Sequence, residues 1–129
     1  MRVPRPVRAP ALLLWVSLLL LVPSPTWPHA IVLESSPGPD AVLVRSPAQV
    51  TFRFNSKIER RFSRVTLAAG DQPPAAVALP ESDDSAAPER LVIPLRPLAP
   101  GVYVLRYRVL AVDGHITEGA LRFTVDAQR

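Results

Sequence analysis

Apolar and polar residues alternate along most of the chain beyond residue 30. In the stretch 49–55, for example, Val50, Phe52 and Phe54 alternate with polar neighbours. A period of two places the apolar side chains on one face of a strand, and one apolar face is typical of half-buried antiparallel strands. The same reading predicts seven extended segments, which are 31–34, 41–44, 49–55, 64–68, 91–95, 102–109 and 120–125.

Residues that favour turns separate these segments. Pro37-Gly38-Pro39-Asp40 and Asp113-Gly114 are two such turns, and the 16 prolines of the chain argue against long helices. Many short strands at this spacing indicate a sandwich or a barrel. We therefore predict an all-β domain, a seven-stranded Greek-key barrel or sandwich of the immunoglobulin-like kind.

The first residues have a different pattern. Arg2, Arg5 and Arg8 precede an uncharged run at 11–22, which is rich in leucine and too short to span a bilayer. A basic segment followed by a short apolar one is typical of a secretory signal peptide. An uncleaved anchor is the alternative, because the uncharged stretch continues to Leu33, although prolines interrupt it. We expect a signal peptide at 1–28, a mature domain at 29–129, and export from the cytoplasm.

Removal of the leader changes the charge balance. Residues 1–28 hold three of the 15 basic residues and none of the 11 acidic ones, so 29–129 carries 12 against 11. The high isoelectric point therefore belongs largely to the leader, and nucleic acid is not an expected partner. The chain has no Cys, so its core must hold without disulfides, which a domain of about a hundred residues can do.

An acidic stretch at 80–90 is interpreted as a solvated loop. Its carboxylates have no fixed spacing, whereas loops that bind hard cations need a defined set of ligands.

The chain has only two histidines, and their positions suggest metal chemistry. His29 lies at the expected start of the mature chain, where a free α-amine and the ring Nδ1 could chelate one metal ion. His115 could supply a third nitrogen and Asp113 an oxygen. Three nitrogens and one oxygen in a plane suit Cu(II). Each feature also has an ordinary interpretation: Asp113-Gly114 as a hairpin turn, His115 as a surface residue, and His29 as a neighbour of the cleavage site.

The domain from His29 onward resembles the CopC family of copper-binding proteins along nearly its whole length. The opening HAIVLESSP and the ending VDGHITEG are especially similar to family motifs. The matching stretches are 29–37, 50–55, 62–65, 98–103 and 107–118.

This resemblance implies a Greek-key β-barrel related in topology to cupredoxins. It further implies a periplasmic, non-enzymatic Cu(II) carrier or buffer for copper homeostasis or resistance. By the same resemblance, one Cu(II) per chain would be held by His29 (amine and ring), Asp113 and His115. The expected partners are the copper ion and a copper-transporting inner-membrane protein, and the expected oligomeric state is a monomer.

Three departures from the family pattern matter. The Met- and His-rich Cu(I) site of its best-known members is missing, since the only Met is Met1, which indicates a Cu(II)-only protein. Ser56 and Lys57 stand where the family often has a carboxylate that could tune the site. Pro28 would occupy the position before the cleaved bond, where small residues are expected; cleavage after Ala30 would instead remove His29.

Two other functions remain open from the sequence. One is a metal-free immunoglobulin-like interaction module. The other is a copper oxygenase with a histidine brace, against which Asp113 would fill the coordination position that an oxygen-activating copper keeps open.

Overall fold

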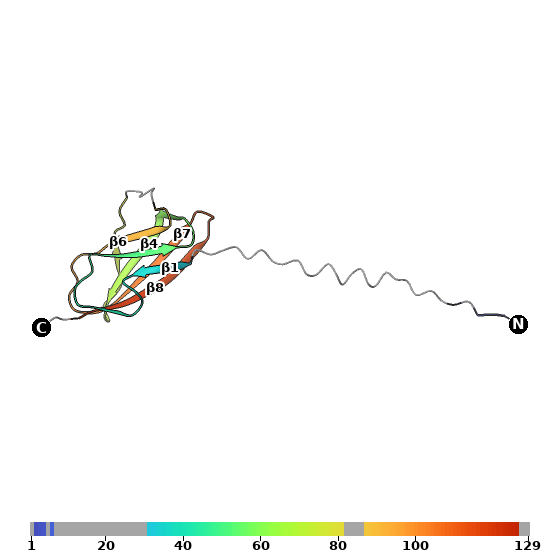
Figure 1. Cartoon of the computed structure of the whole chain (residues 1–129), viewed down its shortest axis with the longest axis horizontal. Helices are drawn as coiled ribbons and strands as arrows, with labels where there is room; N and C mark the ends of the chain where they lie inside the picture. The colour runs from blue at the N-terminus through green and yellow to red at the C-terminus, as the bar shows by residue number, and fades with distance from the viewer. Residues whose placement is uncertain (1, 5, 7–30, 82–86, 127–129) are drawn as a thin grey trace.

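The structure is a computed structural model that describes residues 2–4, 6, 31–81 and 87–126. His29 and most of the expected signal peptide lie outside these residues. Regular secondary structure in the described part is entirely β, and none of its segments is a helix of the length and apolarity needed to cross a membrane. The strands form two sheets (Figure 1). The smaller sheet has the order β1-β3-β6 and contains β1 (Val32–Ser36), β3 (Gln49–Phe54) and β6 (Arg90–Pro94). The larger sheet has the order β2-β8-β7-β4-β5 and contains β2 (Ala41–Leu43), β8 (Ile116–Val125), β7 (Gly101–Ala111), β4 (Ile58–Ala69) and β5 (Ala75–Val77).

The core lies between the two sheets and follows the alternation of the sequence. Phe52 in β3, Leu105 in β7 and Phe123 in β8 are almost fully buried, while their neighbours along each strand are more exposed. Burying the apolar face of each strand is the main favourable term that holds such sheets together. The predicted all-β fold is confirmed, and of the barrel and the sandwich the structure is the sandwich of two sheets.

The strand pattern differs from the prediction in three ways. β5 forms an eighth strand within a short alanine-rich segment that carries no alternation. β4 begins at Ile58 rather than at residue 64, because its first half is irregular. β2 pairs with β8 in parallel, although the other pairs are antiparallel as expected. A period of two cannot reveal strand direction, since it reports only which face is buried.

β7 has two unlike neighbours. Its ladder with β8 runs without interruption from Gly101 to Leu110. Its ladder with β4 breaks between Glu59 and Arg64, where residues 60–63 of β4 have no register partner. We call residues 60–63 the β4 bulge. Bulges bend a strand and redirect its side chains, and they are common next to functional sites.

Several chain segments meet at one end of the domain. The turn between β7 and β8 lies at the same end as the start of β1 (Figure 1), and the link from β3 to β4 joins them there. This end contains Asp113 and His115, two of the three residues predicted to bind metal.

Candidate metal centre

A four-residue hairpin loop carries Asp113 and His115. Residues 112–115 connect β7 to β8, and the Ala111 N–H donates to the His115 carbonyl oxygen over 2.8 Å. The Gly114 N–H donates to the Ala111 carbonyl oxygen over 2.9 Å, and Gly114 has a φ of 89°. A glycine with positive φ is typical at the end of such a loop, where a side chain would be strained. The loop therefore has a defined shape set by the hairpin.

Asp113 holds His115 through two contacts. The His115 backbone N–H donates to Asp113 Oδ1 over 3.0 Å, and His115 Nδ1 lies 3.2 Å from Asp113 Oδ2. The backbone N–H of His115 lowers the pKa of Asp113, since this hydrogen bond favours the ionised carboxylate. The two side chains are about 28% and 32% exposed, so both remain accessible to an ion from solvent.

His115 lies on the inner side of the hairpin. Along the chain, His115 and Thr117 are partly buried, while Ile116 and Glu118 between and after them are exposed. Thr117 Oγ1 is buried and has no hydrogen-bond partner among the residues that the structure describes. A buried hydroxyl without a partner is uncommon and calls for an explanation, such as a bound ion or water. The Thr117 hydroxyl on the inner side of this hairpin is thus a further polar group close in sequence to the two predicted ligands.

A short link between β3 and β4 joins the start of β1 to this loop. Asn55 Oδ1 accepts a hydrogen bond of 2.7 Å from the Ile31 N–H, and the Asn55 N–H donates to the Ile31 carbonyl oxygen over 3.0 Å. Two residues later, the Lys57 carbonyl oxygen accepts a hydrogen bond of 3.1 Å from the Val112 N–H. Ile31 and the β7–β8 loop are therefore both hydrogen-bonded to the short link at Asn55–Lys57.

Glu34, the acidic residue of β1, is already paired. Arg53 of β3 donates to both of its carboxylate oxygens, over 2.7 Å and 3.1 Å. The Arg53 guanidinium lowers the pKa of Glu34 by hydrogen bonding and by charge. This exposed ion pair links β1 to β3, so Glu34 has a structural partner outside the β7–β8 loop.

The predicted ligands are therefore described only in part. The structure brings Asp113 and His115 together, whereas His29 lies outside the described residues. Within the described part of the chain, no group of three or more His, Cys, Asp or Glu side chains forms a complete metal cluster. Sequence reasoning missed the roles of Asn55 and Thr117; the only signal was that each is a polar residue within or next to a strand.

The fold and the loop define a class before any relative is considered: a small two-sheet β domain with an Asp-x-His hairpin at one end. The family model described as "CopC domain" matches residues 32–126 of this chain. Protein YobA of Escherichia coli K12 is 31% identical over 107 residues, which cover 82% of this chain and 85% of YobA. CopC from Methylosinus trichosporium OB3b has a similar crystal structure, with a TM-score of 0.71 and 29% identity over 78% of this chain and 97% of that one.

A further crystal structure, of the methionine-rich copper resistance protein PcoC from E. coli, has a TM-score of 0.59 and 27% identity, covering 77% of this chain and 100% of PcoC. The chain belongs to the CopC family, and its relatives include proteins named for copper resistance and for copper transport. The resemblance seen in the sequence is confirmed at the level of the family.

Proposed function

We propose that this protein is a periplasmic Cu(II) carrier or buffer that acts as a monomer and holds one Cu(II) ion through His29, Asp113 and His115. The observation that carries this proposal is the pair of contacts between Asp113 and His115 at the end of the domain where β1 begins. Membership of the CopC family supports copper as the ion.

Chain length supports His29 as the remaining ligand residue. Ile31 is hydrogen-bonded to Asn55. Val112 of the proposed metal-binding loop is hydrogen-bonded to Lys57, which follows Asn55 by two residues. Two residues of extended chain span at most about 7 Å. Ile31 is therefore anchored close to the loop, and His29, two residues before it, has only a short distance to span to bind the same ion.

The proposed donor set suits Cu(II). The His29 amine and ring nitrogen would close a chelate, His115 would add a second imidazole, and Asp113 would add an anionic oxygen. An ionised carboxylate has about four lone-pair positions, so Asp113 can hold His115 and still bind the ion. Nitrogen and oxygen donors in a tetragonal plane favour Cu(II), while thiols and thioethers favour Cu(I).

A carrier role without catalysis is consistent with the same donors. Four donors in the plane leave no position there for a substrate or for oxygen, whereas a catalytic metal keeps one open. The chain has no Cys and no Met beyond Met1 for a separate Cu(I) site, in contrast to a methionine-rich relative such as PcoC.

A competition titration tests the proposal. Protein that begins at His29 should take up one Cu(II) per chain from a coloured Cu(II) chelator, and His115→Ala should bind far more weakly while its circular dichroism spectrum stays unchanged. Asp126→Asn is a matched control for a lost carboxylate, because Asp126 is exposed just after β8, at the far end of that strand from the loop. Uptake of copper by His115→Ala with unchanged affinity would overturn the proposal.

A second protein, with one extra residue before His29, tests the contribution of the α-amine to copper binding. The extra residue turns the amine into an amide and removes one donor from the chelate. We expect the affinity to fall by orders of magnitude, since linked donors avoid a second association cost of roughly several kcal/mol. Equal affinities for the two proteins would show that the amine is not a ligand.

A further inference from the structure

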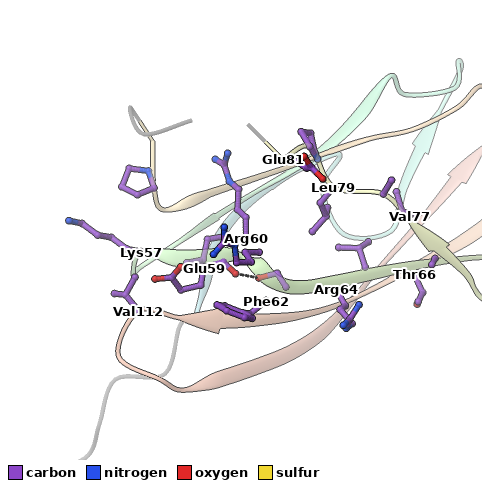
Figure 2. A pocket seen from close by; sticks show the side chains of 18 residues that line it. Lys57, Glu59, Arg60, Phe62, Arg64, Thr66, Val77, Leu79, Glu81 and Val112 are labelled. Carbon is purple, nitrogen blue, oxygen red and sulfur yellow. Dashed lines mark hydrogen bonds between the residues drawn. The ribbon is translucent and has the colours of Figure 1, made fainter. Parts of the chain in front are cut away.

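A groove runs along the first half of β4, beside the proposed copper site. β5 pairs with β4 only from Val65 to Leu67, and beyond Val77 the chain diverges from β4. The space between them is a groove of about 930 Å³. Figure 2 shows Lys57 and Val112 at one end of it and Val77 and Thr66 at the other. We call this feature the β4 groove.

The β4 bulge places an aromatic side chain on this surface. Phe62 lines the β4 groove and is 61% exposed, although the other three phenylalanines of the chain are almost fully buried. Val112, which precedes Asp113, also lines the groove and is exposed. Exposed aromatic residues surrounded by polar ones are typical of the centre of a protein interface.

The side chains around Phe62 are mainly basic. Among the residues that the structure describes, two carboxylates, Glu59 and Glu81, line the groove, and so do four cationic side chains, which belong to Lys57, Arg60, Arg61 and Arg64. Arg60 donates to the Arg90 carbonyl oxygen over 2.9 Å, so it also has a structural role.

The positive charge continues across the outer face of the sheet. Arg64 also lines a neighbouring hollow of about 430 Å³, together with Arg106 and Arg108 of β7. Arg64 is the direct cross-strand partner of Arg108, and like charges directly opposite each other destabilise a sheet. Glu118 offsets this charge only in part, through a pair of 3.2 Å with Arg108. Because this pairing of like charges lowers the stability of the sheet, we consider Arg64 and Arg108 candidates for binding a partner.

We propose that the β4 groove is the docking surface for an acidic segment of a partner protein, which seats an apolar side chain against Phe62 while it exchanges copper at the adjacent loop. The purpose of the docking rests on the proposed copper-carrier function, but the binding itself rests on the groove. A groove beside an exposed aromatic ring fits a polypeptide better than a flat lipid surface. Charge complementarity with Lys57, Arg61 and Arg64 selects an acidic one.

A peptide titration followed by NMR tests this proposal. The probe is the synthetic peptide Glu-Glu-Leu-Glu-Glu, and Lys-Lys-Leu-Lys-Lys is its matched control. The acidic peptide should shift the amide signals of residues 57–66 and of Val112 in the metal-free protein, and its affinity should fall at higher salt. The basic peptide should leave these signals unchanged.

Substitutions in the groove identify the side chains that bind the acidic peptide. Arg61→Glu/Arg64→Glu and Phe62→Ser should each weaken the acidic peptide about tenfold, which is a change of about 1.4 kcal/mol. Arg122→Glu and Val42→Ser, an exposed arginine and an exposed valine outside the groove, are the matched controls and should have no effect. If the double variant does not fold, Arg61→Glu alone carries the same test.

Three results would overturn the proposal: equal binding of the basic peptide, an equal loss in Arg122→Glu, or signal changes away from the groove. Displacement of the acidic peptide by anionic phospholipid vesicles would assign the surface to a membrane instead. Copper titration separates the two proposals, because Phe62→Ser should bind Cu(II) as tightly as the parent protein. A parent protein that fails to bind Cu(II) would contradict the carrier function and leave the peptide result standing.

Discussion

The two edges of β7 have different structures. On one edge, β8 pairs with β7 residue by residue from Gly101 to Leu110, and the hairpin delivers Asp113 and His115 in a fixed geometry. On the other edge, pairing with β4 breaks, and the β4 bulge exposes Phe62. Regular pairing positions ligands to within a fraction of an ångström, whereas irregular pairing creates accessible surface at little cost to the core.

The largest expected effect is in the core under the regular edge. Leu105 of β7 is fully buried, so Leu105→Ala should lower the free energy of unfolding by about 2–5 kcal/mol through lost burial and a residual cavity. Urea denaturation followed by fluorescence measures this change. A loss below about 1 kcal/mol, which is typical of a site that collapses or is exposed, would show that the two edges do not differ as described.

A second effect tests how closely the regular edge is packed. A Cβ at Gly119 of β8 would clash with the ring and hydroxyl of Tyr107, its cross-strand partner in β7. That ring cannot move freely, because it packs against Phe52 at a centroid distance of 4.8 Å. Gly119→Ala should therefore destabilise the protein by about 1–3 kcal/mol. Gly38→Ala is the control, since a Cβ there meets nothing within 4 Å, and equal stability of the two variants would contradict the close packing.

A third effect concerns the loop that the regular edge supports. Asp113→Asn should weaken Cu(II) binding by roughly 10- to 100-fold, because the amide keeps an oxygen donor but loses the negative charge. Competition titration of this variant against Asp126→Asn measures the effect. An unchanged affinity would make Asp113 a turn residue only.

The pH dependence of copper release sharpens this prediction. The pKa of Asp113 lies below its ordinary value of 3.8, mainly because the His115 backbone N–H favours the ionised carboxylate, so Asp113 stays ionised to a lower pH than an ordinary Asp. Copper should be released as the pH falls, because its nitrogen donors must be deprotonated to bind it, and Asp113→Asn, which binds copper more weakly, should release it at a higher pH than the parent protein. The contribution of Asp113 to folding is present above the ordinary carboxyl range and is lost only as the pH falls through the lowered pKa.

The smallest effect is expected at the irregular edge. Phe62→Ser should change the free energy of unfolding by no more than about 0.5 kcal/mol, because the side chain is largely exposed. The same urea experiment compares it with Leu105→Ala. A loss of several kcal/mol would place Phe62 in the core and remove the basis for the docking surface.

The sequence predicts the regular parts of this molecule well and the irregular parts poorly. Alternation at Val50, Phe52 and Phe54 identifies buried faces because burial and the pleat share a period of two. The β4 bulge breaks that period, so its residues carry no pattern that sequence reasoning could use. Asp113 and His115 are recognisable because three adjacent residues combine a turn with two donors, whereas the hydrogen bonds of Asn55 depend on a strand that is distant in sequence.

Electron paramagnetic resonance of the Cu(II)-loaded protein tests the central proposal most directly. Protein that begins at His29 should give an axial Cu(II) spectrum with hyperfine splitting from the amine and from both imidazoles. In His115→Ala, loaded with the same Cu(II), the splitting from one imidazole should be lost. Identical spectra for the two proteins would show that His115 does not bind the ion, and would contradict a copper site at the end of the β7–β8 hairpin.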